Sequence, residues 1–212
     1  MRSVVMLWLS SLAVLAAGAL AVCPDGRCGI GGFDRTGLGL AHALRSGWLD
    51  AMMQGITWFG SLILLLPLTA AVAWLLVRSR RRREAGFLLL ALLGSSALSH
   101  VFKLWVARPR PDLFPTWLDM PGDWSFPSAH AMQATAVALA WLLVARHARE
   151  FWALLLGLAV LLVGLSRIYL QLHFPSDVVV GSLAALLWVA GLHALLLRLA
   201  TDDHRKPGEG AA

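Results

Sequence analysis

Six long apolar stretches restrict this chain to folds that are built inside a membrane. A helix needs roughly 20 apolar residues to cross about 30 Å of hydrocarbon. The stretches cover residues 3–22, 56–77, 86–105, 129–146, 151–168 and 177–199. The chain is 58% hydrophobic and only 14% charged, and its mean hydropathy of +0.71 lies outside the range of soluble domains. The sequence therefore predicts an all-α integral membrane bundle of about six transmembrane helices.

We expect a single membrane domain over residues 1–212. Residues 1–22 are interpreted as an uncleaved first span or signal anchor, because the apolar stretch is longer than a typical signal-peptide core. Cleavage is the alternative, and it would leave an odd number of spans. Residues 200–212 are polar and are expected to form a solvated tail.

The distribution of Lys and Arg predicts the orientation, because short connections rich in these residues stay cytoplasmic. With the N-terminus inside, 11 of the 18 basic residues are cytoplasmic. They are Arg2, Arg78, Arg80 to Arg83, Arg146, Arg149, Arg198, Arg205 and Lys206. The run of arginines at residues 80–83 is interpreted as part of this topology signal, despite a pI of about 10.6, and no nucleic-acid partner is expected.

Three polar motifs interrupt the apolar pattern at the ends of the stretches, where an ionisable side chain is costly and usually functional. The first contains Lys103 and Arg110-Pro111, the second is Pro127-Ser128-Ala129-His130, and the third contains Ser166-Arg167, His173 and Asp177. The predicted orientation brings all three motifs to the non-cytoplasmic face. Convergence on one face is what a shared site requires.

The ordered spacing Lys-x6-Arg-Pro, Pro-Ser-Ala-His and Ser-Arg-x5-His-x3-Asp resembles the signature of the type 2 phosphatidic acid phosphatase superfamily of lipid phosphate phosphatases. The resemblance implies that His173 is a nucleophile that forms a phosphohistidine. It also implies that Asp177 orients His173 and that His130 protonates the departing lipid oxygen. It implies neither a metal nor another cofactor.

The same resemblance implies a phosphate-binding set of basic and backbone groups, comprising Lys103, Arg110, Ser128, Ala129 and Arg167. Arginine binds phosphate through two parallel N–H groups, whereas lysine acts as a mobile point charge. Backbone amides after Pro127, at Ser128 and Ala129, are expected to point toward an oxyanion at a helix N-terminus. The family more often has glycine where this chain has Ala129.

Four residues near the motifs have open roles. Arg108 is a second candidate for phosphate binding, with headgroup contact as the alternative, and His100 lies one helical turn before Lys103. Cys23 and Cys28 are the only cysteines. An oxidising compartment would favour a disulfide between them, and two thiols alone do not make a structural zinc site.

The resemblance implies that the motifs bind phosphate, but it does not identify the lipid that carries the phosphate. An outward-facing site in a bacterial inner membrane favours hydrolysis of undecaprenyl diphosphate to undecaprenyl phosphate. Phosphatidylglycerophosphate, phosphatidate and lipid A phosphates are the competing substrates. The expected partners are the lipid phosphate substrate and membrane phospholipids, with no obligate protein partner. A lipid-binding or transport protein that retains the site is the non-enzymatic alternative.

Overall fold

The computed structural model describes residues 1–115, 120–145 and 147–204, and this part of the chain forms helices and no strands. The expected polar tail lies mostly outside the described residues. The α-helices are α1 (Arg2–Val22), α2 (Gly32–Ala43), α3 (Gly47–Thr57), α4 (Leu62–Arg78), α5 (Arg82–Val106), α6 (Ala129–Val144), α7 (Arg149–Tyr169) and α8 (Pro175–His204). Two short 3-10 helices, η1 (Pro24–Gly26) and η2 (Trp58–Gly60), follow α1 and α3.

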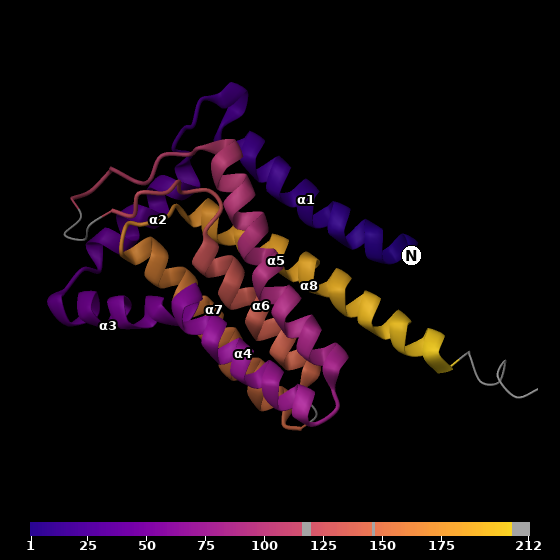
Figure 1. Ribbon diagram of the computed structural model, residues 1–212. Helices are drawn as coiled ribbons and strands as arrows, with labels where there is room; N and C mark the ends of the chain where they lie inside the picture. The colour runs from indigo at the N-terminus through magenta and orange to yellow at the C-terminus, as the bar shows by residue number, and fades with distance from the viewer. Residues whose placement is uncertain (116–119, 146, 205–212) are drawn as a thin grey trace, which may run out of the picture.

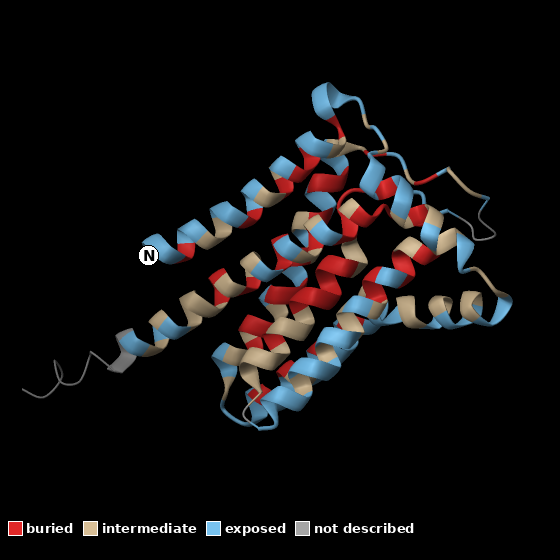
Figure 2. Ribbon diagram, turned by 180° about the vertical axis from the view of Figure 1, so that it is seen from behind, coloured by how far each residue is buried: buried red, intermediate tan, exposed pale blue. Residues whose placement is uncertain are grey.

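Helix α6 forms the centre of the bundle and contacts α4, α5, α7 and α8. The residues from Ala131 to Ala136 are all buried, and the buried positions gather along the interior of the bundle in Figure 2. Small alanine side chains let the neighbouring helices approach closely, as is typical where helices pack within a membrane. Helix α1 lies along α8 on the outside (Figure 1), and Ser11 Oγ donates a hydrogen bond to the Ala184 carbonyl at 2.8 Å.

Among the helices of the described residues, fewer than six meet a strict criterion of length and composition for a membrane span. Four helices, α1, α5, α7 and α8, are long and apolar enough to cross a membrane, and the pair formed by α3–η2 and α4 raises the number to five if it counts as one span. The predicted span at residues 56–77 is broken, because the chain bends by 45° before Leu62, where Ser61 caps α4. Helix α6 has only 16 residues.

Helices α2 and α3 cover one end of the bundle. Helix α2 contacts α7 and α8, and α3 contacts α7. Figure 1 shows α3 lying across the direction of the bundle helices. The start of α1, the last turns of α8 and the α4–α5 and α6–α7 connections lie away from this end (Figure 1).

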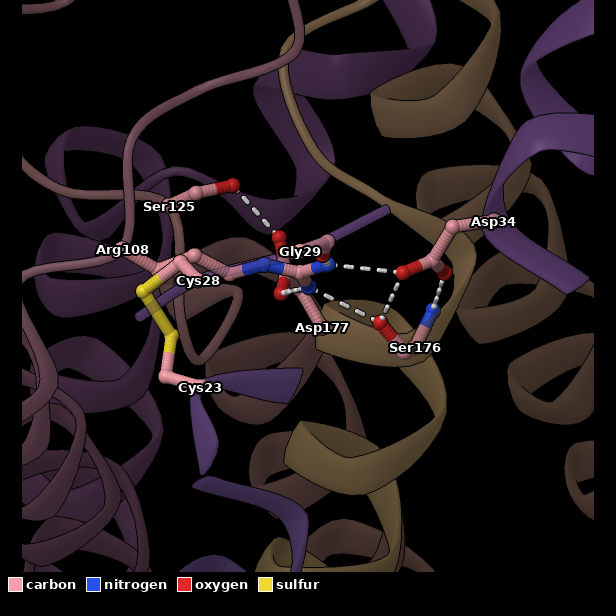
Figure 3. Close-up of a disulfide and its surroundings, with 8 residues drawn as sticks. All are labelled: Cys23, Cys28, Gly29, Asp34, Arg108, Ser125, Ser176 and Asp177. Carbon is pink, nitrogen blue, oxygen red and sulfur yellow. Dashed lines mark hydrogen bonds and ion pairs between the residues drawn. A yellow bond between two sulfur atoms is a disulfide. The ribbon is translucent and has the colours of Figure 1, made fainter. Parts of the chain in front are cut away.

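A disulfide joins Cys23 to Cys28 and closes the short loop after α1. The pairing is the one that an oxidising compartment would favour. After Cys28 the chain continues through Gly29 into α2. The bridged loop therefore lies beside the end of the bundle that α2 covers (Figure 3).

Candidate active site

The three motifs meet at the end of the bundle covered by α2 and α3. Lys103 lies in the last turn of α5 and Arg167 in the last turn of α7. Ser128 caps α6, and Ala129 is the first residue of that helix. His173 lies in the α7–α8 connection, and Asp177 lies in the first turn of α8. Helix ends thus supply most of the motif residues, whereas Arg110 and His173 lie in connections.

Two residues with left-handed backbone turn the chain into the site. Ala107 has a φ of 48° and ends α5, and Gln171 has a φ of 57° just after α7. A residue other than glycine adopts this region at a cost, and such residues gather at functional sites. Gly181 adds a close approach, because a Cβ on it would lie 3.3 Å from the Ser128 carbonyl oxygen. These positions bring the motif segments next to one another.

His173 and Asp177 form a buried pair with a defined direction. The Nδ1 atom of His173 lies 3.5 Å from Asp177 Oδ2, and its Nε2 atom lies 3.4 Å from Arg110 Nη1. The distance to Asp177 is long for a hydrogen bond, and catalytic hydrogen bonds often shorten when substrate binds. One ring nitrogen therefore faces the carboxylate and the other faces a phosphate-binding candidate.

The pKa of His173 is held well below its ordinary value. Burial is the largest cause, and the positive charges of Arg167, Arg110 and Lys103 lower this pKa further. The imidazole is therefore neutral at pH 7 and keeps a nitrogen lone pair. A neutral ring is the form that a nucleophilic histidine needs.

An aspartate joins two of the predicted phosphate-binding cations. The carboxylate of Asp123 lies 3.1 Å from Lys103 Nζ and forms an ion pair with Arg110. Partial burial raises the pKa of Asp123, but the hydrogen bond from Arg110 and the charges of Lys103 and Arg110 outweigh this and lower it to about 2. Lys103 also donates to the Trp124 carbonyl. The two cations therefore converge on one position, which an anionic group occupies.

Arg167 and His130 line the other side of the site. Arg167 is almost fully buried, and its Nη1 donates to Thr57 Oγ1 at 2.9 Å. Its Nε atom has no partner among the described residues. His130 packs against η2, because a Cβ on Gly60 would lie 3.0 Å from His130 Cβ. The positive charge of Arg167 interacts electrostatically with the side chains of both His130 and His173.

A cavity of about 290 Å³ opens beside His130. Its walls come from α3, η2, α4, α6 and the segment that follows α7, and they combine four apolar with four polar side chains. The lining residues are Gln54, Thr57, Trp58, Ser61, Ile63, His130, Leu170 and Leu172. This composition suits a ligand that has both an apolar and a polar part.

The start of α6 differs in one respect from the expectation. The Ser128 amide donates to the Asp177 carbonyl at 3.2 Å, so it does not point freely toward an anion. The Ser128 hydroxyl is fully buried and has no partner among the described residues. Ala129 begins α6 as expected, so its amide belongs to the first turn, where a helix has no internal acceptors.

Several residues at the site were missed by sequence reasoning or had open roles there. Ser125 Oγ donates to Asp177 Oδ2. Arg108 is 1% exposed and forms ion pairs with Asp34 and Asp177 (Figure 3), so it faces carboxylates rather than headgroups. His100 is exposed. The sequence feature that could have identified Asp34 and Arg108 is their charge in a mostly apolar chain. A buried charge lowers stability unless it is paired with an opposite charge.

Comparison with known proteins places this arrangement among phosphatases. A family model described as the PAP2 superfamily matches residues 84–200. Phosphatidylglycerophosphatase B of Bacillus subtilis is 36% identical over 158 residues, which are 70% of this chain and 76% of that protein. An undecaprenyl-diphosphatase of Sulfolobus acidocaldarius is 32% identical over 138 residues, which are 63% of this chain and 64% of that protein.

The fold itself also has a solved counterpart. The crystal structure of a transmembrane PAP2-type phosphatidylglycerolphosphate phosphatase from Bacillus subtilis matches with a TM-score of 0.72 and 30% sequence identity. The match covers 95% of this chain and 98% of that one.

A helical bundle with several apolar spans and a polar site at the helix ends defines a multi-pass membrane enzyme that acts on phosphate groups. The matched region contains all three motifs. The chain belongs to the PAP2 superfamily, and it is a lipid phosphate hydrolase. The resemblance inferred from the motif spacing is therefore confirmed.

Proposed function

We propose that the chain hydrolyses undecaprenyl diphosphate to undecaprenyl phosphate through a phosphohistidine at His173. The observation that carries the mechanism is the direction of the His173 ring, with Nδ1 toward Asp177 and Nε2 toward Arg110. A carboxylate on one nitrogen fixes the tautomer and leaves the other nitrogen free to attack. In this mechanism Nε2 attacks the terminal phosphorus, and the bond from this phosphorus to the bridging oxygen breaks on the opposite side, so that undecaprenyl phosphate is the leaving group.

The phosphate would take the place of the Asp123 carboxylate between Lys103 and Arg110. Arg167 adds a third positive charge, and its unpartnered Nε and the unpartnered Ser128 hydroxyl are buried groups that phosphate oxygens would satisfy. Leaving such groups without partners costs about 1–3 kcal/mol each. Cationic groups arranged around the transferred phosphoryl stabilise the charge of its transition state. No metal is required in this mechanism.

His130 is proposed as the general acid. Its ring has no hydrogen-bond partner among the described residues, and it lines the cavity in which the departing lipid would lie. After the lipid leaves, a water molecule attacks the phosphohistidine, and His130 accepts the proton of that water.

The isoprenoid diphosphate is favoured by the proposed orientation of the site. The arginine-rich connections support an orientation in which the motifs face the non-cytoplasmic side of a bacterial inner membrane. A site with this orientation suits the recycling of undecaprenyl diphosphate to the monophosphate carrier that is used in envelope synthesis. Phosphatidylglycerophosphate is the second candidate, because the relative that matches over 95% of the chain is named for it.

The substrate is tested by phosphate release from purified protein in detergent. We expect undecaprenyl diphosphate to give the highest kcat/KM in a panel with phosphatidylglycerophosphate, phosphatidate and lipid A phosphates. Each reaction contains excess chelator and is repeated with vanadate, which is expected to inhibit because it resembles the phosphoryl transition state. A higher kcat/KM for phosphatidylglycerophosphate would show that this lipid, and not undecaprenyl diphosphate, is the preferred substrate. A strict requirement for added magnesium or zinc would contradict the mechanism.

The orientation is tested by labelling single cysteines in intact cells. Both native cysteines are in the disulfide, so the wild-type background has no free thiol. Gly122→Cys adds an exposed thiol near the site, and Ser79→Cys adds an exposed thiol at the opposite end. An impermeant maleimide is expected to label the first variant only. The reverse pattern would place the site in the cytoplasm and remove the argument for undecaprenyl diphosphate.

A further inference from the structure

Arg108 is buried between two carboxylates at the edge of the site (Figure 3). Its Nη1 lies 2.6 Å from Asp177 Oδ1, and its Nη2 lies 2.7 Å from Asp34 Oδ2. The guanidinium also lies 3.9 Å from the centre of the Phe174 ring. Its planar fork is therefore occupied by Asp34 and Asp177.

Asp34 anchors this arrangement from α2. It is 3% exposed, and its two oxygens accept hydrogen bonds from both the amide and the hydroxyl of Ser176, at 2.9 and 2.8 Å. Ser176 is the residue next to Asp177. Asp34 thus holds the start of α8 directly, and it holds the side chain of Asp177 through Arg108.

The two oxygens of Asp177 have separate partners. Oδ1 accepts from Arg108, whereas Oδ2 accepts from Ser125 and from the Phe174 amide, and faces His173 Nδ1. Rotation of the carboxylate would break the charged contact with Arg108. The ion pair therefore keeps Oδ2 directed at the imidazole.

We propose that Asp34 and Arg108 are positioning residues, which hold Asp177 so that it directs His173 Nε2 at phosphorus. This inference rests on the proposed phosphohistidine mechanism. It assigns Arg108 to the carboxylate and not to the phosphate. It also makes α2 part of the catalytic apparatus, although Asp34 precedes the region that matches the family model.

Asp34→Asn in the full-length protein tests this role. The change keeps the size of the side chain and removes the charge that holds Arg108. We expect kcat to fall about 10- to 100-fold, the scale of a misplaced reacting group. KM and the competitive inhibition constant of inorganic phosphate are expected to change less than about twofold, because Lys103, Arg110 and Arg167 are untouched.

Asp50→Asn is the matched control. Asp50 is a partly buried carboxylate on α3 that contacts Arg45 and Tyr169, so its neutralisation should leave kcat unchanged. Arg108→Lys keeps the positive charge but removes the guanidinium group that contacts Asp34 and Asp177 at the same time. This variant should have a lower kcat without a higher KM. All variants are compared by elution volume in size-exclusion chromatography and by melting temperature. The two substitutions test the same ion-pair network independently, so a folding failure of one leaves the other as the test.

The outcomes separate the alternatives. A rise in KM and in the phosphate inhibition constant at unchanged kcat would show that Arg108 binds phosphate, and would overturn the proposal. Unchanged kinetics in both variants would also overturn it, as would loss of kcat only in proportion to loss of folded protein. If the wild type released no phosphate from any lipid of the panel, the proposed function itself would fail, and the positioning role with it.

Discussion

His173→Ala is expected to reduce turnover to the background rate, and phosphoenzyme should no longer form. Removal of an enzyme nucleophile costs on the order of 10⁶-fold in kcat. The Nε2 atom lies beside Arg110, and no group elsewhere in the mechanism can replace the attacking nitrogen. The measurement is phosphate release, together with quenching of the enzyme and labelled substrate in base, because a phosphohistidine is acid-labile and stable in base.

His100→Ala is the control for this experiment. His100 is on α5, one turn before Lys103, and its side chain is exposed. The His100 variant should keep wild-type turnover and the same amount of trapped phosphoenzyme. Appreciable activity in the His173 variant would show that the nucleophile has been misassigned, even though the family is correct.

His130→Ala is expected to lower kcat for the lipid substrate by about 10²- to 10⁴-fold, the usual contribution of a general acid. The phosphorylation step should be restored with an aryl phosphate whose leaving group departs without a proton. A burst of aryl alcohol equal to the enzyme concentration is the measurement, since the loss of His130 also slows the hydrolysis of the phosphohistidine that follows.

The two histidine variants are therefore expected to differ in kind. His173→Ala should show no burst with the same aryl phosphate. If the burst were missing in His130→Ala and present in His173→Ala, the assigned roles would be reversed. A phosphorylated peptide that contained His130 would lead to the same conclusion.

Apolar stretches predicted the helices well because span length depends on local composition. The stretch 86–105 lies within α5, and 177–199 lies within α8. The stretch 56–77 was predicted less well, since Ser61 begins a new helix there and the axis bends. A capping residue inside an apolar run changes the hydropathy little, so the sequence pattern did not indicate the break.

The motif residues were found because charge is rare and costly in such a chain. Asp34, Ser125 and Asp123 were not recognised as site residues, since no spacing rule connects them to their partners. Asp34 lies 142 residues from Ser176, and Ser125 lies 52 residues from Asp177. Pairings over such separations depend on how the helices pack.

The sequence by itself determined the membrane environment, the helical class and the chemical identity of the proposed site, because hydropathy and motif spacing are local properties of the chain. Only the tertiary structure decided the partners of each charge. It placed Arg108 between Asp34 and Asp177, Asp123 between Lys103 and Arg110, and the Ser128 amide on the Asp177 carbonyl. The physical reason is that a buried charge is stable only beside a partner, and packing of distant helices determines which partner lies within reach.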